Sequence, residues 1–465
     1  MGAAQFMVPE WLAVMHYELL LFAAVFFTLG LVDELVVDAL YGWLRLTGRA
    51  RRQTVLPATE TSYDLHGPAA VFIPAWKEDA VIGHTVSHAL RAWPHRDLRL
   101  YVGCYRNDPA TAAALVDAAH ADSRLRVITI DADGPTSKAH CLNSLFAALR
   151  DDEAQTERSA HMVVLHDAED MVDPAELAVL DRAVQQADFV QLPVLALPRP
   201  QARWIGGHYS DEFAESHAKA MVVRDAIGAS VPGAGVGCAI RRGMLSRLAQ
   251  ENGGAPFAEA SLVEDYELGQ RIARLGGSGR FLRLHAESGR LIATRAYFPD
   301  RLKAAVRQKT RWTHGIALQG WDRLGWHGRW VSRWMMLRDR KGPLAAGLLA
   351  LGYLLVATTT IGHALAHFSI LPPMELTPVL KALLLFNLAG LVWRCLLRAI
   401  FTGREFGWQQ GLLAIPRVVV SNIVAIMSGR RAVAAYLASL RGAPVVWDKT
   451  DHSAHPALAL QGELA

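Results

Sequence analysis

The chain has 465 residues, of which 52% are hydrophobic and 20% charged, and its mean hydropathy is +0.16. This composition is more apolar than a soluble enzyme of that length requires and it excludes a disordered chain, so a membrane protein is favoured. The 48 Lys and Arg residues against 44 Asp and Glu residues leave a net charge of only +4, which argues against a nucleic-acid binder. The four cysteines are far apart and predict neither a disulfide framework nor a zinc site.

Apolar segments of membrane-spanning length gather at the two ends of the chain. Residues 19–32 carry no charge, and with their flanks they approach the ~20 residues that cross a bilayer, although acidic residues border them on both sides. Residues 344–365 and 376–397 are two further apolar segments of spanning length. The sequence therefore predicts an N-terminal transmembrane segment within residues 1–45 and two transmembrane helices within residues 343–400.

The distribution of basic residues predicts the orientation of these spans, because Lys and Arg are retained on the cytoplasmic side. Arg45 and Arg49 follow the first apolar segment and further arginines follow the third, whereas residues 367–378 contain no Lys or Arg. This pattern places the N-terminus outside and residues 46–342 in the cytoplasm.

A fourth apolar stretch at 411–427 is harder to orient. It contains Pro416 and Arg417, and further arginines follow it. If it crossed the membrane, those arginines would lie outside, against the charge bias of the other spans. Residues 401–465 are therefore predicted to form interfacial or re-entrant helices and a cytoplasmic C-terminal tail, with a fourth span as the alternative.

The central region alternates short apolar strands with helical patterns. The runs at 69–75, 98–105, 125–130 and 162–166 are rich in β-branched residues, and patterns of ten or more residues with helical spacing separate them. This order predicts an α/β fold with a parallel, Rossmann-like sheet. Ligands of such sheets bind beyond the carboxyl ends of the strands, so the polar residues that follow each strand are the candidate site.

Three acidic residues, Asp167, Glu169 and Asp170, follow the fourth predicted strand. Carboxylates so close together repel one another unless a hard cation is present, which predicts Mg2+ or Mn2+ held jointly with a diphosphate. An acidic, solvated turn is the alternative. Just downstream, Asp173 and Glu176 are spaced to cap a helix whose first residue would be Pro174.

Two further groups of polar residues lie downstream. Glu264 and Asp265 open an amphipathic helix, where the helix dipole favours ionised carboxylates, although a simple helix cap would have the same pattern. Gln308, Arg311 and Trp312 share one helical face and offer a hydrogen-bond donor, a guanidinium for phosphate and an indole that can stack on a sugar. The alternative is an interfacial helix near 301–335, for which Trp and Arg are ordinary residues.

Five short motifs occur in a fixed order, with membrane spans around them: Ile73 to Glu78, Lys138 to Asn143, Asp167 to Asp170, Glu264 with Asp265, and Gln308 to Trp312. This order resembles that of the membrane-bound family 2 inverting glycosyltransferases, to which cellulose and hyaluronan synthases belong. Within that family the segments at 107–111, 294–299, 308–312 and 447–452 are most similar to those of the glycosyltransferase part of the inner-membrane phage adsorption B proteins.

The resemblance implies a GT-A domain at residues 46–342, in the cytoplasm at the bacterial inner membrane. It also implies a role for each matching position: Ala75 and Glu78 at the uridine, Lys138 and Asp167 at the diphosphate, Asp167, Glu169 and Asp170 at Mg2+ or Mn2+, Asp265 beside Glu264 as the catalytic base, and Gln308, Arg311 and Trp312 at the acceptor and diphosphate. One feature departs from the family, because the second predicted strand is followed by Asn107 and Asp108 instead of an acidic pair. Arg45 with Arg49 alone is too common a pair to indicate a cyclic-dinucleotide site.

The predicted activity is the inverting, metal-dependent transfer of a hexose or N-acetylhexosamine from a UDP-sugar to a growing exopolysaccharide. A single dedicated carboxylate, Asp265, favours transfer, because glycoside hydrolases need a pair of carboxylates that flank the bond. The alternatives are a single transfer to a polyprenyl-phosphate lipid and a catalytically inactive membrane receptor or scaffold. Three or four spans provide little material for a pore, so export is expected to need a homodimer or a partner protein.

Overall fold

The computed structural model describes residues 8–50, 53–55, 63–120, 122–368, 375–443 and 454–458. The predicted tail motif at 447–452 lies outside these residues. The strands are β1 (Gln53–Thr54), β2 (Ala69–Pro74), β3 (Leu98–Tyr105), β4 (Leu125–Ile130), β5 (Met162–Leu165), β6 (Phe189–Gln191), β7 (Val194–Ala196), β8 (Cys238–Arg241), β9 (Gly279–Phe281), β10 (Leu284–His285) and β11 (Thr294–Ala296). Helices before residue 300 are α1 (Val8–Leu46), α3 (Ile82–Ala92), α4 (Pro109–Ala119), α5 (Lys138–Thr156), α6 (Glu176–Ala183), η1 (Pro200–Ala202), α7 (Ile205–Glu215), η2 (Ser216–Ala220), α8 (Met221–Ala226), α9 (Arg242–Glu251) and α10 (Glu264–Arg274). Those after it are α11 (Leu302–Thr313), η3 (His314–Gln319), α12 (Gly320–Leu324), α13 (Trp330–Arg340), α14 (Gly342–His367), α15 (Pro378–Phe406) and α16 (Trp408–Ser439).

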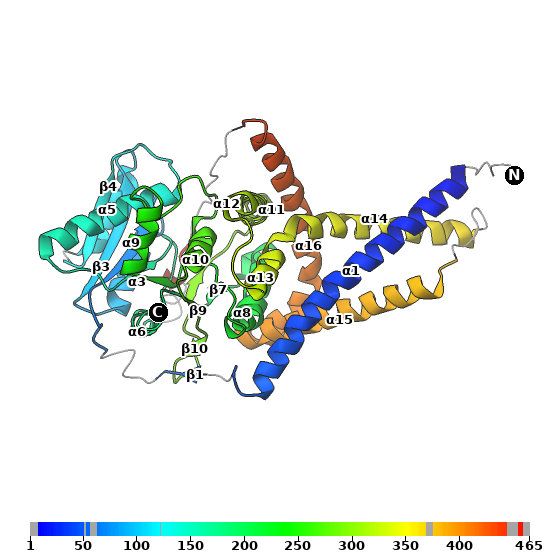
Figure 1. Cartoon of the computed structure of the whole chain (residues 1–465), viewed down its shortest axis with the longest axis horizontal. Helices are drawn as coiled ribbons and strands as arrows, with labels where there is room; N and C mark the ends of the chain where they lie inside the picture. Colours follow the sequence, from blue (N-terminus) through cyan, green and yellow to red (C-terminus); the bar gives the residue numbers. More distant parts are fainter. Residues whose placement is uncertain are drawn as a thin grey trace.

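A seven-stranded sheet in the order β4-β3-β2-β5-β8-β6-β9 forms the centre of the globular domain (Figure 1). The four predicted strands β2 to β5 pair in parallel, which confirms the Rossmann-like α/β fold, and β8 is antiparallel to both of its neighbours. Their bounds match the predicted runs to within one residue, because each run is a buried strand that ends in polar residues.

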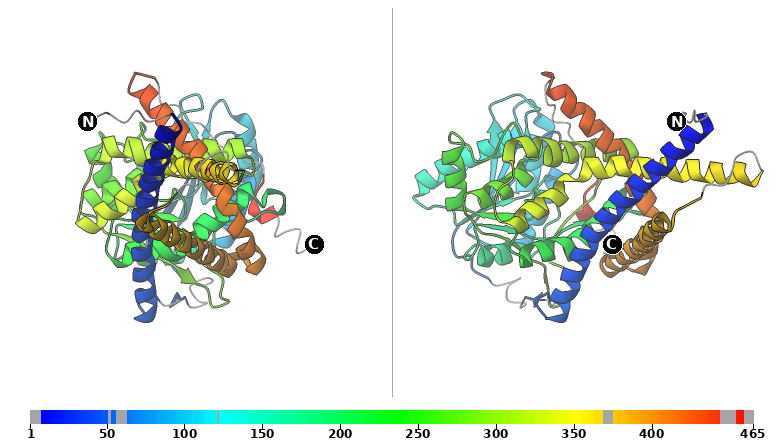
Figure 2. Two further views of the ribbon diagram at one scale, coloured as in Figure 1. Left: turned by 90° about the vertical axis from the view of Figure 1, so that its right-hand side faces the viewer. Right: turned by 45° about the vertical axis from the view of Figure 1, so that its right-hand side comes forward.

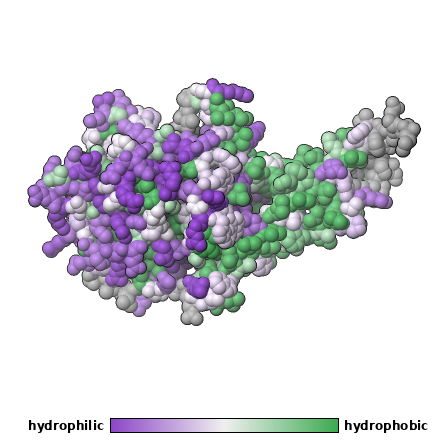
Figure 3. Space-filling view, in the orientation of Figure 1, coloured by the Kyte–Doolittle hydropathy of each residue, from purple (hydrophilic) through white to green (hydrophobic). Residues whose placement is uncertain are grey.

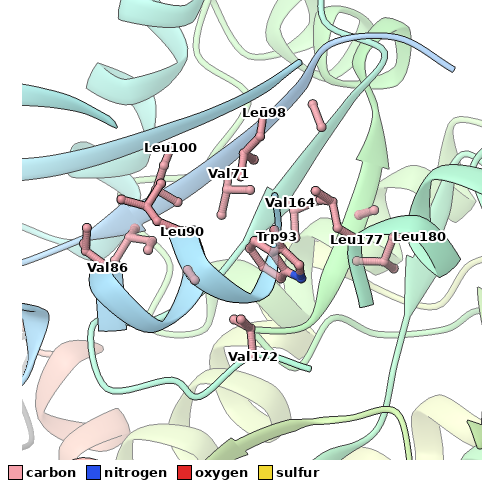
Figure 4. Packing of buried hydrophobic residues seen from close by; sticks show 14 of the residues in the cluster. Val71, Val86, Leu90, Trp93, Leu98, Leu100, Val164, Val172, Leu177 and Leu180 are labelled. Atoms are coloured by element: carbon pink, nitrogen blue, oxygen red, sulfur yellow. The ribbon is translucent and has the colours of Figure 1, made fainter. Parts of the chain in front are cut away.

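The sheet is covered by helices on both faces. Alternate residues of β2 point to opposite sides: Val71 packs in one core with α3, α4 and α6, whereas Phe72 packs in another with α5, α9 and α10. Figure 4 shows the first of these cores, in which Trp93 lies among aliphatic side chains from the sheet and α6. Because both faces of the sheet are buried, the carboxyl ends of its strands remain the open edge where polar loops gather.

Four helices among the described residues are long and apolar enough to cross a membrane: Trp11–Leu46, Gly342–His367, Pro378–Phe406 and Trp408–Ser439. The helices α1, α14 and α15 project from one side of the domain, whereas α16 lies against that side and packs on α7 and α11 (Figure 2). The projecting helices form the apolar part of the surface (Figure 3). The predicted pair of interfacial helices over 411–427 is replaced by one continuous helix, α16, which passes through Pro416. Over residues 301–335, where an interfacial helix was predicted, the chain forms α11, η3, α12 and the start of α13, and the interfacial position stays a prediction.

Charged residues at the domain ends of these helices are paired. Asp33 and Glu34, which weaken the first apolar segment, both bond Lys341, at 2.7 Å and 3.2 Å, and Arg338 contacts both carboxylates. Arg417, which is 1% exposed, donates to Asp211 of α7 at 3.0 Å. Ion pairs in place of isolated charges allow such residues near the apolar segments.

Candidate active site

All the residues predicted for the site line one cavity at the carboxyl ends of β2 and β5. They come from the loop after β2, the first turn of α5, the loop after β5, the start of α10 and the helix α11: Ala75, Glu78, Lys138, Asp167, Glu169, Asp170, Glu264, Asp265, Gln308, Arg311 and Trp312. The fold therefore brings together five motifs that are far apart in sequence.

The ammonium group of Lys138 lies among the carboxylates of this cavity. Its Nζ is 2.5 Å from Asp167 Oδ1 and 3.8 Å from Glu264 Oε1. Burial alone would lower the pKa of Lys138, but the charges of Asp167, Glu264 and Asp265 raise it above its ordinary value. Lys138 is thus a fixed cation at the predicted diphosphate side, and Ser137 positions it by capping α5 through the amide of His140.

Glu264 and Asp265 occupy the first turn of α10, as predicted. Burial, together with the neighbouring charge of Asp265, raises the pKa of Glu264 to about 7, against the opposing charge of Lys138. Burial also raises the pKa of Asp265, against the charge of Lys138 and a hydrogen bond of 2.7 Å from the amide of Tyr266. Asp265 is the less buried of the two and is the better placed to accept a proton from a bound ligand.

A glycine loop that the sequence analysis did not single out packs against Asp265. Gly235 has a φ of +84°, and a Cβ at this position would lie 2.5 Å from Asp265 Oδ2 and 3.3 Å from Lys138 Nζ. A Cβ on Gly233 would lie 2.5 Å from the carbonyl oxygen of Asp265. The sequence does contain three glycines within five residues just before β8, a pattern that indicates a close approach of the backbone to other atoms. Only the tertiary structure shows that Gly233 and Gly235 approach Asp265.

The three acidic residues after β5 have different surroundings. Asp167 is about a third exposed and pairs with Lys138, and Glu169 also lines the cavity. Asp170, by contrast, is 2% exposed, and its Oδ2 accepts from the amide of Asp167 at 2.9 Å and lies 3.0 Å from His166 Nδ1. The carboxylate of Asp170 therefore braces the loop through His166 and the amide of Asp167, and its role as a metal ligand stays a prediction.

A buried ion-pair network supports the same loop. His166 Nε2 lies 2.9 Å from Glu176 Oε1, on the opposite side of the ring from Asp170. Burial would lower the pKa of His166, but Glu176 and Asp170 raise it to about 10. The predicted pairing of Asp173 with Glu176 is present, since the Asp173 amide donates to Glu176 at 3.3 Å, but α6 begins at Glu176 and not at Pro174.

Within the described residues, no group of three His, Cys, Asp or Glu side chains forms a preformed metal site. Mg2+ is commonly held by one or two carboxylates together with substrate phosphates and water, so a full protein shell is not required. Asp167 and Glu169 supply hard oxygen donors at the cavity wall, and this donor set fits such a shared site.

The helix α11 contributes Gln308, Arg311 and Trp312 to the lining of the same cavity. The side chain of Gln308 is 9% exposed, and its Oε1 has no hydrogen-bond partner among the described residues, so it can accept from a ligand hydroxyl. The ring of Trp312 packs edge-on against Tyr209, with centroids 6.1 Å apart, which fixes the orientation of the indole.

Asn107 and Asp108, which follow β3, do not line the cavity. Asn107 exchanges hydrogen bonds with the backbone of Gly134, at 2.9 Å and 3.0 Å. Asp108 accepts from the amides of Lys77, at 2.6 Å, and Thr111, at 3.4 Å, and so caps α4. These side chains therefore shape the loops beside the predicted uridine pocket. Glu78 is the acidic residue that lines this pocket.

A second cavity adjoins the first and shares Thr136 and Leu262 with it. Its walls include Glu259, Gln319 and, from α16, Tyr436. Hydroxyl, amide and carboxylate groups of this kind suit a carbohydrate.

Comparison with known proteins extends these observations. A family model described as Glycosyltransferase like family 2 matches residues 66–315. The chain is 32% identical over 473 residues to bacteriophage adsorption protein B of Escherichia coli strain K12 and, equally, to bacteriophage N4 adsorption protein B of Escherichia coli O157:H7. These alignments cover 95% of this chain but only 62% of each relative, so the chain spans less than two thirds of their length.

Among solved structures, the fold is similar to that of a mannosyltransferase from Pyrobaculum calidifontis in complex with GDP-Man and Mn2+. The TM-score is 0.51 at 16% sequence identity, and the match covers 87% of this chain and 99% of that chain. At this identity the similarity concerns the GT-A fold alone.

Proposed function

This chain belongs to glycosyltransferase family 2, as its motifs predicted. From that premise we propose that it transfers a hexose or N-acetylhexosamine from a UDP-sugar to a growing exopolysaccharide, with inversion of the anomeric configuration. The observation that carries the proposal is the placement of Asp265 opposite Arg311 in one cavity, with Lys138 beside it. One carboxylate with a raised pKa next to two cations suits a reaction that needs one base and an anionic leaving group.

In the proposed reaction, the acceptor hydroxyl oxygen attacks the anomeric carbon from the face opposite the diphosphate. Asp265 accepts the hydroxyl proton while the new C–O bond forms. The bond between the anomeric carbon and the diphosphate oxygen breaks, and UDP departs with the electron pair. Lys138 and Arg311 hold the negative charge of the leaving group, and Gln308 and Trp312 hold the acceptor.

We further propose that Asp167 and Glu169 hold Mg2+ or Mn2+ at the diphosphate. When bound, the cation neutralises charge on the leaving group. The mannosyltransferase that shares the fold was solved with Mn2+ and GDP-Man, which supports a metal in the reaction. The choice of a UDP-sugar as donor rests on the motifs of this chain.

The proposed organisation is that of a multi-pass protein of the bacterial inner membrane, with residues 46–342 as a cytoplasmic catalytic domain. The four apolar helices and the similarity to phage adsorption proteins support membrane association. The second cavity, which reaches from the catalytic cavity to α16, is the proposed approach of the polysaccharide acceptor.

The test is release of the nucleoside diphosphate by the purified protein from a panel of UDP-, GDP- and TDP-sugars. Asp265→Asn should lower turnover by at least ~100-fold, the lower end for loss of a general base, and leave UDP binding unchanged. Asp117→Asn, which changes an exposed carboxylate on α4, is the matched control. Transfer only to added polyprenyl phosphate would favour the lipid acceptor, and absence of release from every donor would favour the receptor or scaffold.

A further inference from the structure

A cavity of about 790 Å³ lies away from the catalytic site, where the ends of α1 and α15 meet the segment from β9 to β11. Seven arginines and two carboxylates line it, which is a large excess of positive charge. Tyr41 of α1 and Phe401 of α15 pack edge-on here, with ring centroids 5.7 Å apart, so the two helices close one wall.

Both carboxylates of the cavity are already engaged. Asp225 accepts from Arg280 at 2.9 Å, and Glu405 pairs with Arg283. Two more of the arginines bond an acid outside the cavity lining, because Arg295 lies 3.1 Å from Asp173 and Arg290 contacts the same carboxylate.

The remaining three arginines, Arg45, Arg49 and Arg404, have no carboxylate partner among the described residues. Arg45 donates to the carbonyl of Ala50 at 2.8 Å, and Arg49 lies over the ring of Trp43. All three are exposed and stand at the ends of two helices that are apolar enough to span a membrane. Their charge is therefore available at the level where the apolar helices meet the polar domain.

The cavity also has apolar walls. Phe401, Phe406 and Leu291 lie beside the arginines. A free inorganic ion gains nothing from these walls, whereas a lipid can place its phosphate on the guanidinium groups and its glycerol and upper acyl carbons against the aromatic rings.

We propose that this cavity binds the phosphate of an acidic membrane phospholipid. Guanidinium groups bind phosphate oxygens with two parallel hydrogen bonds, and basic pockets beside membrane helices on the cytoplasmic side bind anionic headgroups. The inference rests on the proposed insertion of α1 and α15 into the membrane, but it is independent of the sugar that the enzyme transfers.

The test uses the full-length protein in detergent. Mixed micelles of phosphatidylglycerol and phosphatidylcholine with the same acyl chains are added, and bound lipid is counted by native mass spectrometry. We expect the wild type to retain phosphatidylglycerol selectively. The double variant Arg49→Gln with Arg404→Gln should lose affinity by about fivefold per arginine, the change expected for one cationic side chain near an anionic headgroup.

The matched control is the double variant Arg430→Gln with Arg431→Gln, which removes two exposed arginines of α16 away from the cavity. This control should bind phosphatidylglycerol as the wild type does. Equal losses in the two double variants would overturn the site, and displacement of the lipid by inorganic phosphate would overturn the lipid assignment. Neither readout uses sugar transfer, so failure of the proposed enzymatic function would be seen separately.

Discussion

Gly235→Ala is the sharpest test of the catalytic geometry, because the added methyl group would meet the proposed base directly. The new Cβ would lie 2.5 Å from Asp265 Oδ2, whereas ordinary van der Waals contact begins at 3.4 Å. The carboxylate would have to retreat by about 0.9 Å, and Lys138 Nζ, at 3.3 Å, restricts the direction of that movement. A misplacement of about 1 Å at a reacting group can cost on the order of 100-fold in rate, or about 2.7 kcal/mol.

The effect of backbone strain in Gly235→Ala must be separated from the effect of displacing the Asp265 carboxylate. Gly235 has a φ of +84°, so alanine there also costs stability, by roughly 1–2 kcal/mol for a left-handed conformation. Gly253 provides the matched control, since its φ is +67° and a Cβ there would meet nothing within 4 Å. Both variants therefore carry similar strain, but only Gly235→Ala moves the base.

The assay compares the two variants and the wild type at saturating donor, measuring release of the nucleoside diphosphate, with thermal unfolding as the check that each protein is folded. We expect Gly253→Ala to keep the wild-type turnover and Gly235→Ala to lose about 100-fold. If the two variants turn over at the same rate, the placement of Asp265 as the base against this loop is refuted.

Three further predictions test the metal, the buried network and the topology. Chelation should abolish activity, and Glu169→Gln should weaken UDP binding only when metal is present; equal activity with and without chelator would contradict the metal assignment. His166 has a pKa raised from 6.5 to about 10, so its stabilising effect is complete below about pH 6.5 and is lost as the pH rises towards 10. The unfolding temperature should therefore fall over that window, and less so in His166→Gln; parallel pH profiles would count against the network. Reporter fusions after residues 340, 371, 404 and 460 should read inside, outside, inside and inside, and an outside signal at 460 would make α16 a fourth span.

The parts of the fold that the sequence could predict are those with local signals. β3 and β4 match their predicted bounds because each is a single, mostly apolar run between polar residues. The strands β6, β8 and β9 were not predicted, because they have only three or four residues and depend on pairing with partners far away in sequence. Short strands of this kind carry too little pattern to be separated from loops.

The long apolar helices show the same division between local and distant signals. The last apolar stretch contains Pro416 and Arg417, yet α16 is continuous and Arg417 pairs with Asp211 of α7. Asp33 weakened the first segment, and its partner Lys341 is about three hundred positions away. Hydropathy counts each charge separately, so it cannot include partners that only the fold supplies.

The acidic residues of the candidate site show why sequence alone does not assign a role to each carboxylate. The acidic residues after β5 are equivalent by composition, and the sequence assigned Asp167, Glu169 and Asp170 alike to a metal. In the structure their partners distinguish them: Asp167 faces Lys138 in the cavity, whereas Asp170 faces the buried His166. A carboxylate with a buried structural partner is not available to a ligand, while one paired with a cavity cation can exchange that partner for a metal or a phosphate counter-charge. The sequence identifies where acidic residues gather, and the burial and charge of each partner determine which of them can bind the donor.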